Sequence, residues 1–433
     1  MKSINAKKAL EISLDPATPF LPKEELMGFV IKYLTRSKFF LEELKNHASP
    51  IYILDTSALL DRAEQFKKEF RSVLPDAAFY FAVKSNNHPE ISRRLIQAGY
   101  GLDVSSGMEL RMALELESKE IVFSGPGKTE EELDLAARNS GCVTVLLDSF
   151  GELHRLERIA SAINSQVRAG IRLTTNPKGL WRKFGIPAGQ LKEFLATSQG
   201  CKHIALSGIQ FHTSWNLSAD AQVGFIHYLS KLLASMREDF RMPLEFLDIG
   251  GGYWPEQGEW LQQAGTPEGM IKKAKGKDVN SPDRHYRLPA EQLKQFAKKI
   301  GQAIQEHISP FRGLKICLEP GRWICNDAMH LLMTVVDKKA ADLIITDAGT
   351  NAIGWERFEI DYFPVLNLTR PSMSERPCLI LGSLCTPHDV WGYSYFGKKI
   401  CEGDVLMIPC QGAYTYSLRQ NFIKPEPEVV VME

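Results

Sequence analysis

Between residues 50 and 321, short apolar runs alternate with longer windows that have the 3.6-residue period of an amphipathic helix. Such alternation, repeated along a chain, predicts a parallel sheet covered by helices. Closure into a (β/α)8 barrel accommodates the runs best. They occupy residues 51–54, 78–83, 102–104, 121–124, 143–147, 169–173, 204–211, 246–249 and 316–318. A barrel needs one strand fewer, so either residues 51–54 belong to another domain or one run is not a strand.

The two ends of the chain show different patterns. Residues 23–44 have a helical period, which predicts a helical N-terminal extension over residues 1–49. After Gly321 the apolar segments are separated by turn residues and few helical windows occur. This predicts an all-β C-terminal domain over residues 323–433, which follows a barrel over residues 56–322. The expected β segments are residues 331–336, 343–346, 378–381, 405–408 and 422–431.

One stretch, residues 253–288, fits neither pattern. It directly follows three consecutive glycines and is rich in Gly, Pro, Lys and Gln. Long irregular loops at such positions are often lids over a functional site. A lid is therefore the first interpretation of this insertion.

Composition narrows the classes of function. The chain has 433 residues, which favours two domains, and 52 Lys and Arg residues balance 52 Asp and Glu residues. The chain has no basic tract of the kind that binds nucleic acid or an anionic membrane, so the expected partner is a small molecule. No run approaches the roughly 18 apolar residues of a membrane span, and residues 1–19 lack the core of a signal peptide, so we expect a cytoplasmic protein. The cysteines form no CxxC pair, and we expect no metal site.

Polar residues follow the apolar runs where each predicted barrel strand ends. The carboxyl ends of barrel strands form one face, which carries the active site in this architecture. We therefore expect these residues to lie together. In chain order they are Lys84, Asp103, Ser105, Ser124, Gly125, Pro126, Gly127, Arg172, His212, Gly250, Gly251, Gly252, Glu319, Pro320, Gly321 and Arg322.

Lys84 stands out because it ends an aromatic and apolar run, residues 79–83. A lysine there either extends its ammonium from a core strand into water, or is desolvated and becomes a nucleophile that forms a Schiff base with a carbonyl. The other strand ends favour the second interpretation. Three consecutive glycines, residues 250–252, can cradle a phosphate with their N–H groups, and Arg322 adds a positive charge.

Glu319 and His212 extend the same interpretation. Burial would raise the pKa of Glu319 unless a cation holds it ionised, and a protonated pyridine nitrogen would serve. His212, next to Phe211, can lie flat against an aromatic ring. A glycine run alone is often a turn, and a lone histidine is often a core residue. At successive strand ends, however, these groups together describe a site for pyridoxal 5′-phosphate (PLP).

Ordered motifs over residues 50–425 resemble the fold-type III PLP-dependent decarboxylases, which include diaminopimelate, ornithine and biosynthetic arginine decarboxylases. The motifs are FAVKSN (81–86), SGPGKT (124–129), KFG (183–185), LDIGGG (247–252), EPGR (319–322), LCTPHD (384–389) and GAYT (412–415). The resemblance implies an amino-acid decarboxylase with an alanine-racemase-like (β/α)8 barrel and a C-terminal β-sandwich or barrel-like domain. It also implies that residues 50–55 form a strand that pairs with the β-domain.

The resemblance assigns roles to individual residues. Lys84 would hold PLP as a Schiff base, Glu319 would pair with the pyridinium, and the glycines 250–252 would bind phosphate with Arg322 and Tyr414. The other implied or expected cofactor contacts are Asp103, Arg172, His212, Ser214 and Gly321, with His212 also catalytic.

A homodimer with shared active sites is implied as well. Cys385 of the LCTPHD motif would cross into the partner's site and donate a proton to the substrate α-carbon. Lys183 would then pair with the partner's Asp389, so that interface and site are built together.

The chain departs from the family pattern where the distal end of the substrate would be held. Thr386 follows Cys385, where an acidic residue is usual. Asp347 begins a DAG motif, yet Trp355 stands in the position of a carboxylate-binding arginine, with Arg357 and Glu356 nearby. The family's His-x-Gly-Ser also becomes the run HTSW over residues 212–215.

These changes favour a substrate with a bulkier or less basic distal part, as in siderophore- and polyamine-pathway relatives, because an unpaired buried charge is costly. Trp215, Trp355 and Trp391 are candidates to line its pocket. The expected substrate contacts are Asp347, Trp355, Arg357, Thr386 and Asp389.

Two alternatives use the same barrel. An amino-acid racemase would typically place an arginine at the pyridine nitrogen, which Glu319 opposes. A non-catalytic, regulatory PLP-binding homologue would usually lack a catalytic residue, whereas Lys84, Glu319, Cys385 and Tyr414 are all present.

Overall fold

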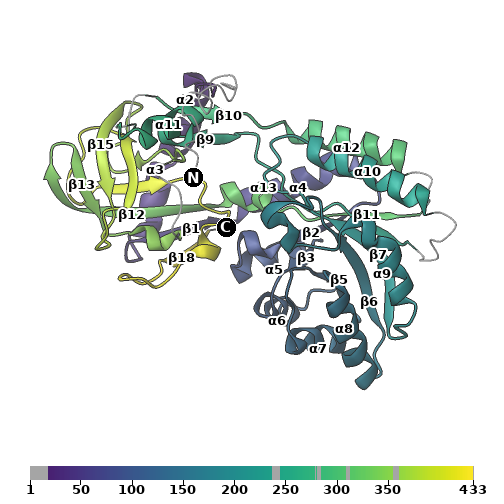
Figure 1. The fold of residues 1–433 in the computed structure, drawn as a ribbon. Helices are drawn as coiled ribbons and strands as arrows, with labels where there is room; N and C mark the ends of the chain where they lie inside the picture. Colours follow the sequence, from purple (N-terminus) through teal and green to yellow (C-terminus); the bar gives the residue numbers. More distant parts are fainter. Residues whose placement is uncertain are drawn as a thin grey trace, which may run out of the picture.

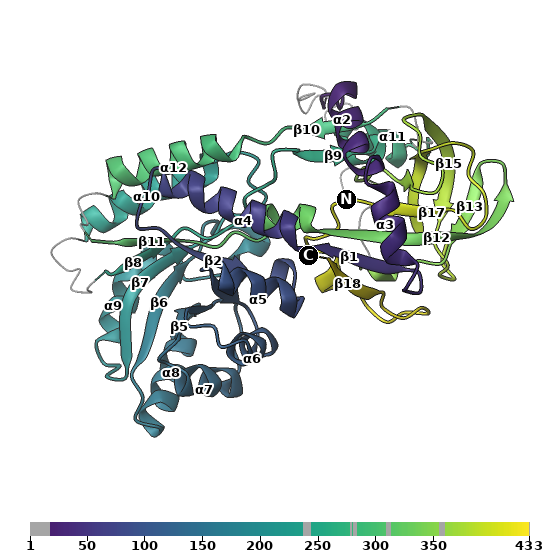
Figure 2. The ribbon, with the colours of Figure 1, turned by 180° about the vertical axis from the view of Figure 1, so that it is seen from behind.

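The computed structural model describes residues 18–236, 244–277, 279, 284–308, 313–354 and 360–432. Two lobes are visible in Figure 1, a barrel with its surrounding helices and a β-rich lobe joined to it through α4 (Thr56–Arg71) and α13 (Arg322–Cys325). Seen from behind in Figure 2, the N-terminal helices α2 (Lys23–Leu34) and α3 (Ser37–Leu44) lie along the β-rich lobe. The α/β architecture expected from the strand and helix pattern is confirmed.

The barrel is closed and its paired strands are parallel, in the order β11-β2-β3-β4-β5-β6-β7-β8. The strands are β2 (Ala78–Ala82), β3 (Gly101–Val104), β4 (Ile121–Phe123), β5 (Val143–Leu147), β6 (Val167–Leu173), β7 (Ile204–Phe211), β8 (Phe246–Asp248) and β11 (Lys315–Leu318). The helices between them include α5 (Pro89–Gln97), α6 (Gly107–Glu115), α7 (Glu130–Arg138), α8 (Phe150–Ala162), α9 (Leu191–Ser198), α10 (Asp220–Ser235) and α12 (Leu293–His307).

Local sequence explains where several barrel helices begin. The side chains of Asp55, Ser106 and Ser149 each accept a backbone N–H from the first turn of the following helix. Thr129 and Glu132 form a reciprocal capping box at the start of α7. The caps at Ser106, Thr129 and Ser149 fix short turns at the carboxyl ends of barrel strands, where predicted site residues lie.

The second sheet has the order β13-β15-β16-β14-β17-β12-β1-β18. Its strands are β1 (Ile51–Asp55), β12 (Met329–Ala340), β13 (Leu343–Thr346), β14 (Leu366–Asn367), β15 (Glu375–Leu381), β16 (Val390–Phe396), β17 (Val405–Ile408) and β18 (Glu428–Met432). β1 pairs antiparallel with β12 and parallel with β18, so the ninth apolar run lies outside the barrel. Sequence reasoning missed β14 and β16, and residues 422–427 are not part of a strand.

The insertion after the glycines is tied down at several points. It contains β9 (Glu259–Leu261), α11 (Pro267–Ala274) and β10 (Tyr286–Leu288), and β9 pairs antiparallel with β10. Tyr286 also bridges to Phe20, and Leu261 bridges to Asp361 in the β-rich lobe. In this structure the insertion is a wall held by both neighbours and not a detached lid.

Among the helices that the structure describes, none is both long and apolar enough to cross a membrane. Nor do the described side chains contain a group of three or more His, Cys, Asp or Glu residues that could hold a metal ion.

Candidate functional site

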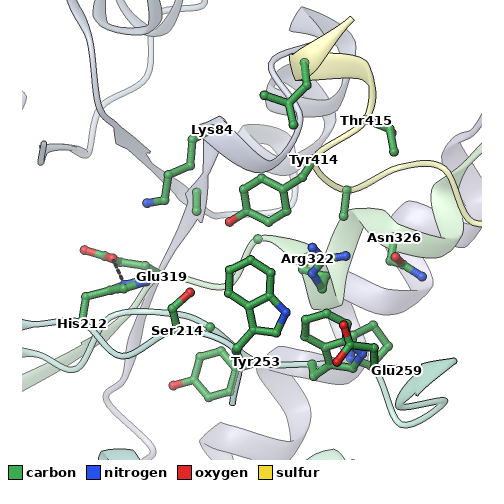
Figure 3. A pocket seen from close by; sticks show the side chains of 18 of the residues that line it. Lys84, His212, Ser214, Tyr253, Glu259, Glu319, Arg322, Asn326, Tyr414 and Thr415 are labelled. Atoms are coloured by element: carbon green, nitrogen blue, oxygen red, sulfur yellow. Dashed lines mark ion pairs between the residues drawn. The ribbon is translucent and has the colours of Figure 1, made fainter. Parts of the chain in front are cut away.

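A cavity of about 490 Å³ lies at the carboxyl ends of the barrel strands, between the barrel, the insertion and the β-rich lobe (Figure 3). Most of the residues predicted at the strand ends line it. These are Lys84, Ser105, Ser124, Gly125, Pro126, Arg172, His212, Ser214, Gly252, Glu319, Gly321, Arg322 and, from the GAYT motif, Tyr414. Asp103, Gly250 and Gly251 lie behind this lining and contact it.

Lys84 directly follows β2 and points into the cavity. Its Nζ donates to Oδ2 of Asp103 at 2.8 Å, and Ser124 Oγ donates to the other oxygen of that fully buried carboxylate. Burial alone would lower the pKa of Lys84, but the carboxylates of Asp103 and Glu319 outweigh it and raise that pKa above its ordinary value. The amine is therefore held in place as an ammonium, with its proton acceptor already in contact.

Glu319 follows β11 and is 1% exposed. Gln210 Nε2 donates to its Oε1 at 3.2 Å, and Nδ1 of His212 lies 3.4 Å from its Oε2. Burial would raise the pKa of Glu319, but the neighbouring His212 and Lys84 outweigh it and lower that pKa to about 2. Glu319 is thus an ionised carboxylate at the base of the cavity, as the sequence predicted for a partner of a ring cation.

Burial lowers the pKa of His212. Its Nδ1 lies 3.2 Å from the backbone N of Gly251 as well as near Glu319. These contacts fix the ring against the glycine run.

The glycine run is compressed against neighbouring backbone. A Cβ at Gly251 would lie 2.1 Å from the carbonyl oxygen of Glu319, and Gly252 has φ +84°. Side chains are therefore excluded at these positions. The N–H of Gly250 donates to Asp248 Oδ1 at 2.8 Å, so two of the three amides have acceptors inside the protein.

Arg322 and Tyr414 form the other side of the cavity. The guanidinium of Arg322 lies 4.3 Å from the ring centre of Trp254 and 4.9 Å from that of Tyr414. Tyr414 has φ +59°, and its N–H donates to Ser85 O at 2.8 Å, which ties the GAYT segment to the residue after Lys84. Both side chains point toward the same space in Figure 3.

The expected residues of the β-rich lobe behave differently. Asp389 is 2% exposed, and its carboxylate accepts the N–H groups of Thr350 (2.7 Å) and Leu384 (2.6 Å). Asp347 accepts the N–H of Thr334 at 2.8 Å. Neither lines the cavity, nor do Thr386 and the exposed Cys385. Asp347 and Asp389 shape loops of their own chain, so Asp389 would reach a partner's lysine only if this loop rearranged.

The tryptophans expected around the distal pocket separate into three cases. Trp215 lines the cavity and its ring stacks on that of Trp254, with centres 6.2 Å apart. Trp391 is wrongly predicted, because it is fully buried and its Nε1 donates to Ala348 O inside the β-rich lobe. Trp355, like Glu356 and Arg357, lies outside the described residues.

Sequence reasoning missed the aromatic wall formed by the insertion and the β-rich lobe. Trp254 and Trp260 come from the insertion, and Tyr362 and Phe363 come from the opposite lobe. Glu259 and Asp361 lie in the same wall. The only sequence signal was the run YWPEQGEW over residues 253–260, which places two tryptophans directly after the glycines.

Comparisons with known proteins also point to a site for a pyridoxal cofactor. The family model described as "Pyridoxal-dependent decarboxylase, pyridoxal binding domain" matches residues 58–326. L-glutamyl-[BtrI acyl-carrier protein] decarboxylase of Niallia circulans is 24% identical over 403 residues, which covers 86% of both chains. Diaminopimelate decarboxylase of Bacillus subtilis is 25% identical over 416 residues, 90% of this chain and 88% of the relative.

A third relative, from Staphylococcus aureus, is 2-[(L-alanin-3-ylcarbamoyl)methyl]-2-hydroxybutanedioate decarboxylase, 25% identical over 420 residues, 90% of this chain and 96% of its own. Among solved structures, diaminopimelate decarboxylase from M. jannaschii superposes with a TM-score of 0.76 at 21% identity, over 90% of this chain and 89% of its own. That likeness supports the barrel and β-domain architecture.

The residues on the cavity wall fit the cofactor of this family, pyridoxal 5′-phosphate. A lysine amine, an ionised buried carboxylate, an imidazole and an arginine converge there, and Gly252 brings backbone to the cavity wall. In that order, these four groups suit the aldehyde, the ring cation, the aromatic ring and the phosphate of the cofactor.

Proposed function

Because this chain belongs to the pyridoxal-dependent decarboxylase family and uses pyridoxal 5′-phosphate, we propose that it decarboxylates an α-amino acid whose distal part is larger than that of diaminopimelate or ornithine. The observation that carries the proposal is the cavity of about 490 Å³ with its aromatic wall. Such a wall offers flat apolar area to a long side chain.

The cofactor, when bound, supplies the electron sink for loss of the α-carboxylate. Lys84 gives up a proton from Nζ before it can act as a nucleophile, and Asp103 Oδ2, at 2.8 Å, is placed to hold that proton. Glu319 remains ionised and stabilises positive charge at the base of the cavity. Arg322, Tyr414 and the amide of Gly252, which lines the cavity, would hold the phosphate.

The names of two relatives support a larger distal group. One acts on a glutamyl group carried by a protein, and the other on an alanine unit joined through a carbamoyl link to a hydroxybutanedioate. In this chain the wall combines Trp254, Trp260 and Tyr362 with the carboxylates Glu259 and Asp361. It can therefore pack an extended group and accept hydrogen bonds from it.

A second copy of the chain completes the site in this proposal. Cys385 is exposed and does not line the cavity of its own chain, and its loop is held by Asp389. A homodimer would bring the partner's Cys385 to the α-carbon, where its thiol donates a proton after the carboxylate has left. Exposed Lys183 would lie at the same interface.

The test is CO2 release from a panel of α-amino acids: ornithine, arginine, meso-diaminopimelate, and 2,3-diaminopropionate or diaminopimelate acylated at the distal amine. We expect one of the acylated conjugates to give the highest kcat/KM. Efficient turnover of meso-diaminopimelate with no turnover of any conjugate would overturn the substrate proposal. The family assignment would stand in that case.

A further inference from the structure

A second carboxylate lies directly behind Glu319. Asp248 is the last residue of β8 and is fully buried. Its Oδ1 accepts the N–H of Gly250 at 2.8 Å, whereas Oδ2 has no hydrogen-bond partner in the described part of the chain. An ionised carboxylate with one bare buried oxygen costs several kcal/mol unless another group compensates it.

Gln210 lies beside Asp248 and also has a buried oxygen that receives no hydrogen bond from the part of the chain that the structure describes. The two residues are register partners on β7 and β8, so their side chains share one face of the sheet. Gln210 Nε2 donates to Glu319 at 3.2 Å, and its Oε1 is buried without a donor among the residues described. The side chains of Asp248, Gln210 and Glu319 therefore offer more hydrogen-bond acceptors than donors. One added proton would turn an acceptor into a donor and satisfy the group.

We propose that Asp248 is a neutral carboxylic acid that donates a hydrogen bond from Oδ2 to Glu319, so that Glu319 carries the only negative charge of the pair. The inference rests on the proposed role of Glu319 toward the cofactor. Asp248 touches neither cofactor nor substrate, and acts as a positioning residue through Glu319.

The surroundings of Asp248 support a neutral acid. Asp248 and Glu319 lie close together, since Gln210, the register partner of Asp248, donates to Glu319, and two neighbouring buried carboxylates do not readily both ionise. Burial and the charge of Glu319 raise the pKa of Asp248 well above its ordinary value. Asp103, Tyr80, Tyr253 and Cys317 also lie near Asp248 and bring no positive charge, while the cations of the site, Lys84 and His212, lie against Asp103 and Glu319.

The proton on Asp248 has a consequence for Glu319. With donors from Gln210 and Asp248, the Glu319 carboxylate is a weaker base than a bare buried carboxylate would be. A weaker base leaves the proton on the ring nitrogen of the cofactor, where the electron sink needs it. Asp248 and Gln210 would thus set how strongly Glu319 competes for that proton.

The first test observes the proton without any turnover. Infrared difference spectra of the cofactor-free and cofactor-loaded wild-type protein at neutral pH, with and without ¹³C-labelled aspartate, should show a protonated carboxylic C=O band that shifts with the label. The band should be missing in Asp248→Asn. A wild-type protein in which no aspartate band of this kind exists would overturn the proposal, and this measurement does not depend on any variant folding.

The second test compares Asp248→Asn with Asp248→Ala. The asparagine amide keeps a donor toward Glu319 and cannot ionise, so cofactor affinity, measured by equilibrium titration, should stay close to wild type. The alanine variant loses the donor and should bind about tenfold more weakly, the value of one hydrogen bond to a charged group. The pH at which the absorbance of the bound cofactor changes should also move in Asp248→Ala.

Equal losses of affinity in both variants would indicate an ionised Asp248 and contradict the proposal. The proposal for the substrate and the proposal for Asp248 can each be contradicted without the other. If the infrared band is present but no conjugate is decarboxylated, the substrate proposal fails while the neutral acid stands. If conjugates are decarboxylated but the band is missing, the reverse holds.

Discussion

The mouth of the barrel and the loop that carries Cys385, residues 383–389, are built in different ways. At the mouth, side chains from distant strands meet one another, as Lys84 meets Asp103 at 2.8 Å. In the loop, Asp389 turns both oxygens toward backbone N–H groups and Cys385 remains exposed. The mouth thus brings its side chains together within one chain, whereas the loop is held by its own backbone and leaves Cys385 at the surface. In the proposed dimer, cofactor binding and proton donation would therefore depend on separate parts of the molecule.

The largest expected effect tests the mouth. Lys84→Ala removes the amine that contacts Asp103 and should lower CO2 release by about a thousandfold or more, because covalent capture of the cofactor is lost. The absorbance of the lysine-bound cofactor should disappear as well. Lys178→Ala, which changes an exposed lysine on a loop, is the control and should retain both signals. Substantial activity in Lys84→Ala would remove the basis of the site.

The next effect tests the loop and the proposed dimer. Cys385→Ala should lower kcat by about a hundredfold, the typical contribution of a positioned proton donor. When Lys84→Ala and Cys385→Ala chains are co-expressed with different tags and the mixed dimer is purified, one site contains both intact residues. That dimer should recover about half of the wild-type rate. A mixed dimer as inactive as its parents would mean that Cys385 acts in its own chain or not at all.

A third prediction concerns the stability of the β-rich lobe. His330 on β12 is 1% exposed, accepts the N–H of Cys410 through Nδ1, and has its pKa lowered by burial to about 4. Because the unfolded chain takes up this proton near pH 6.5 and the folded chain only near pH 4, the free energy of unfolding should fall by about 3 kcal/mol as pH drops across that window.

Urea denaturation of wild type and His330→Gln at pH 7 and pH 4.5 measures this difference. The variant should show a smaller loss between the two values. Exposed His154 provides the matched control, since His154→Gln makes the same exchange at the surface of the barrel. An identical pH dependence in all three proteins would contradict the assignment.

The smallest effect sharpens the substrate side. Trp215 is 55% exposed on the cavity rim and stacks on Trp254. Trp215→Ala should lower kcat/KM for bulky conjugates by about tenfold, through lost contact area, and should change that for ornithine less. Met270→Ala, an exposed position on α11, serves as the control. Equal losses for large and small substrates would place Trp215 in general support of the site.

How much the sequence predicted differs between the same two regions. The barrel was predictable because each strand end is local: Lys84 follows an apolar run, and glycines follow residues 247–249. Parallel closure then brings these ends to one face without further information. The run at residues 51–54 pairs with a strand more than 270 residues away. Hydrophobic periodicity is a local signal and cannot identify so distant a partner.

The cavity wall was beyond sequence reasoning for a physical reason. Trp260 and Tyr362 meet only because the insertion pairs with the segment around Asp361, a contact across 100 residues. The expectation for Asp389 came from the family resemblance, which implies a pair with Lys183 of a second chain; sequence could not show that the N–H groups of Thr350 and Leu384 bind its carboxylate within its own chain. Trp391 was misplaced in the same way by packing inside the lobe.

The pairing of β1 with β18 also sets an order of events during synthesis. β1 emerges from the ribosome early, yet one of its two sheet neighbours, β18, is made about 370 residues later. The GAYT segment that closes the cavity against Lys84 is made just before that neighbour. Barrel strands can pair while translation continues, whereas both edges of β1 stay unpaired until β12 is made, and one edge stays unpaired until β18 is made.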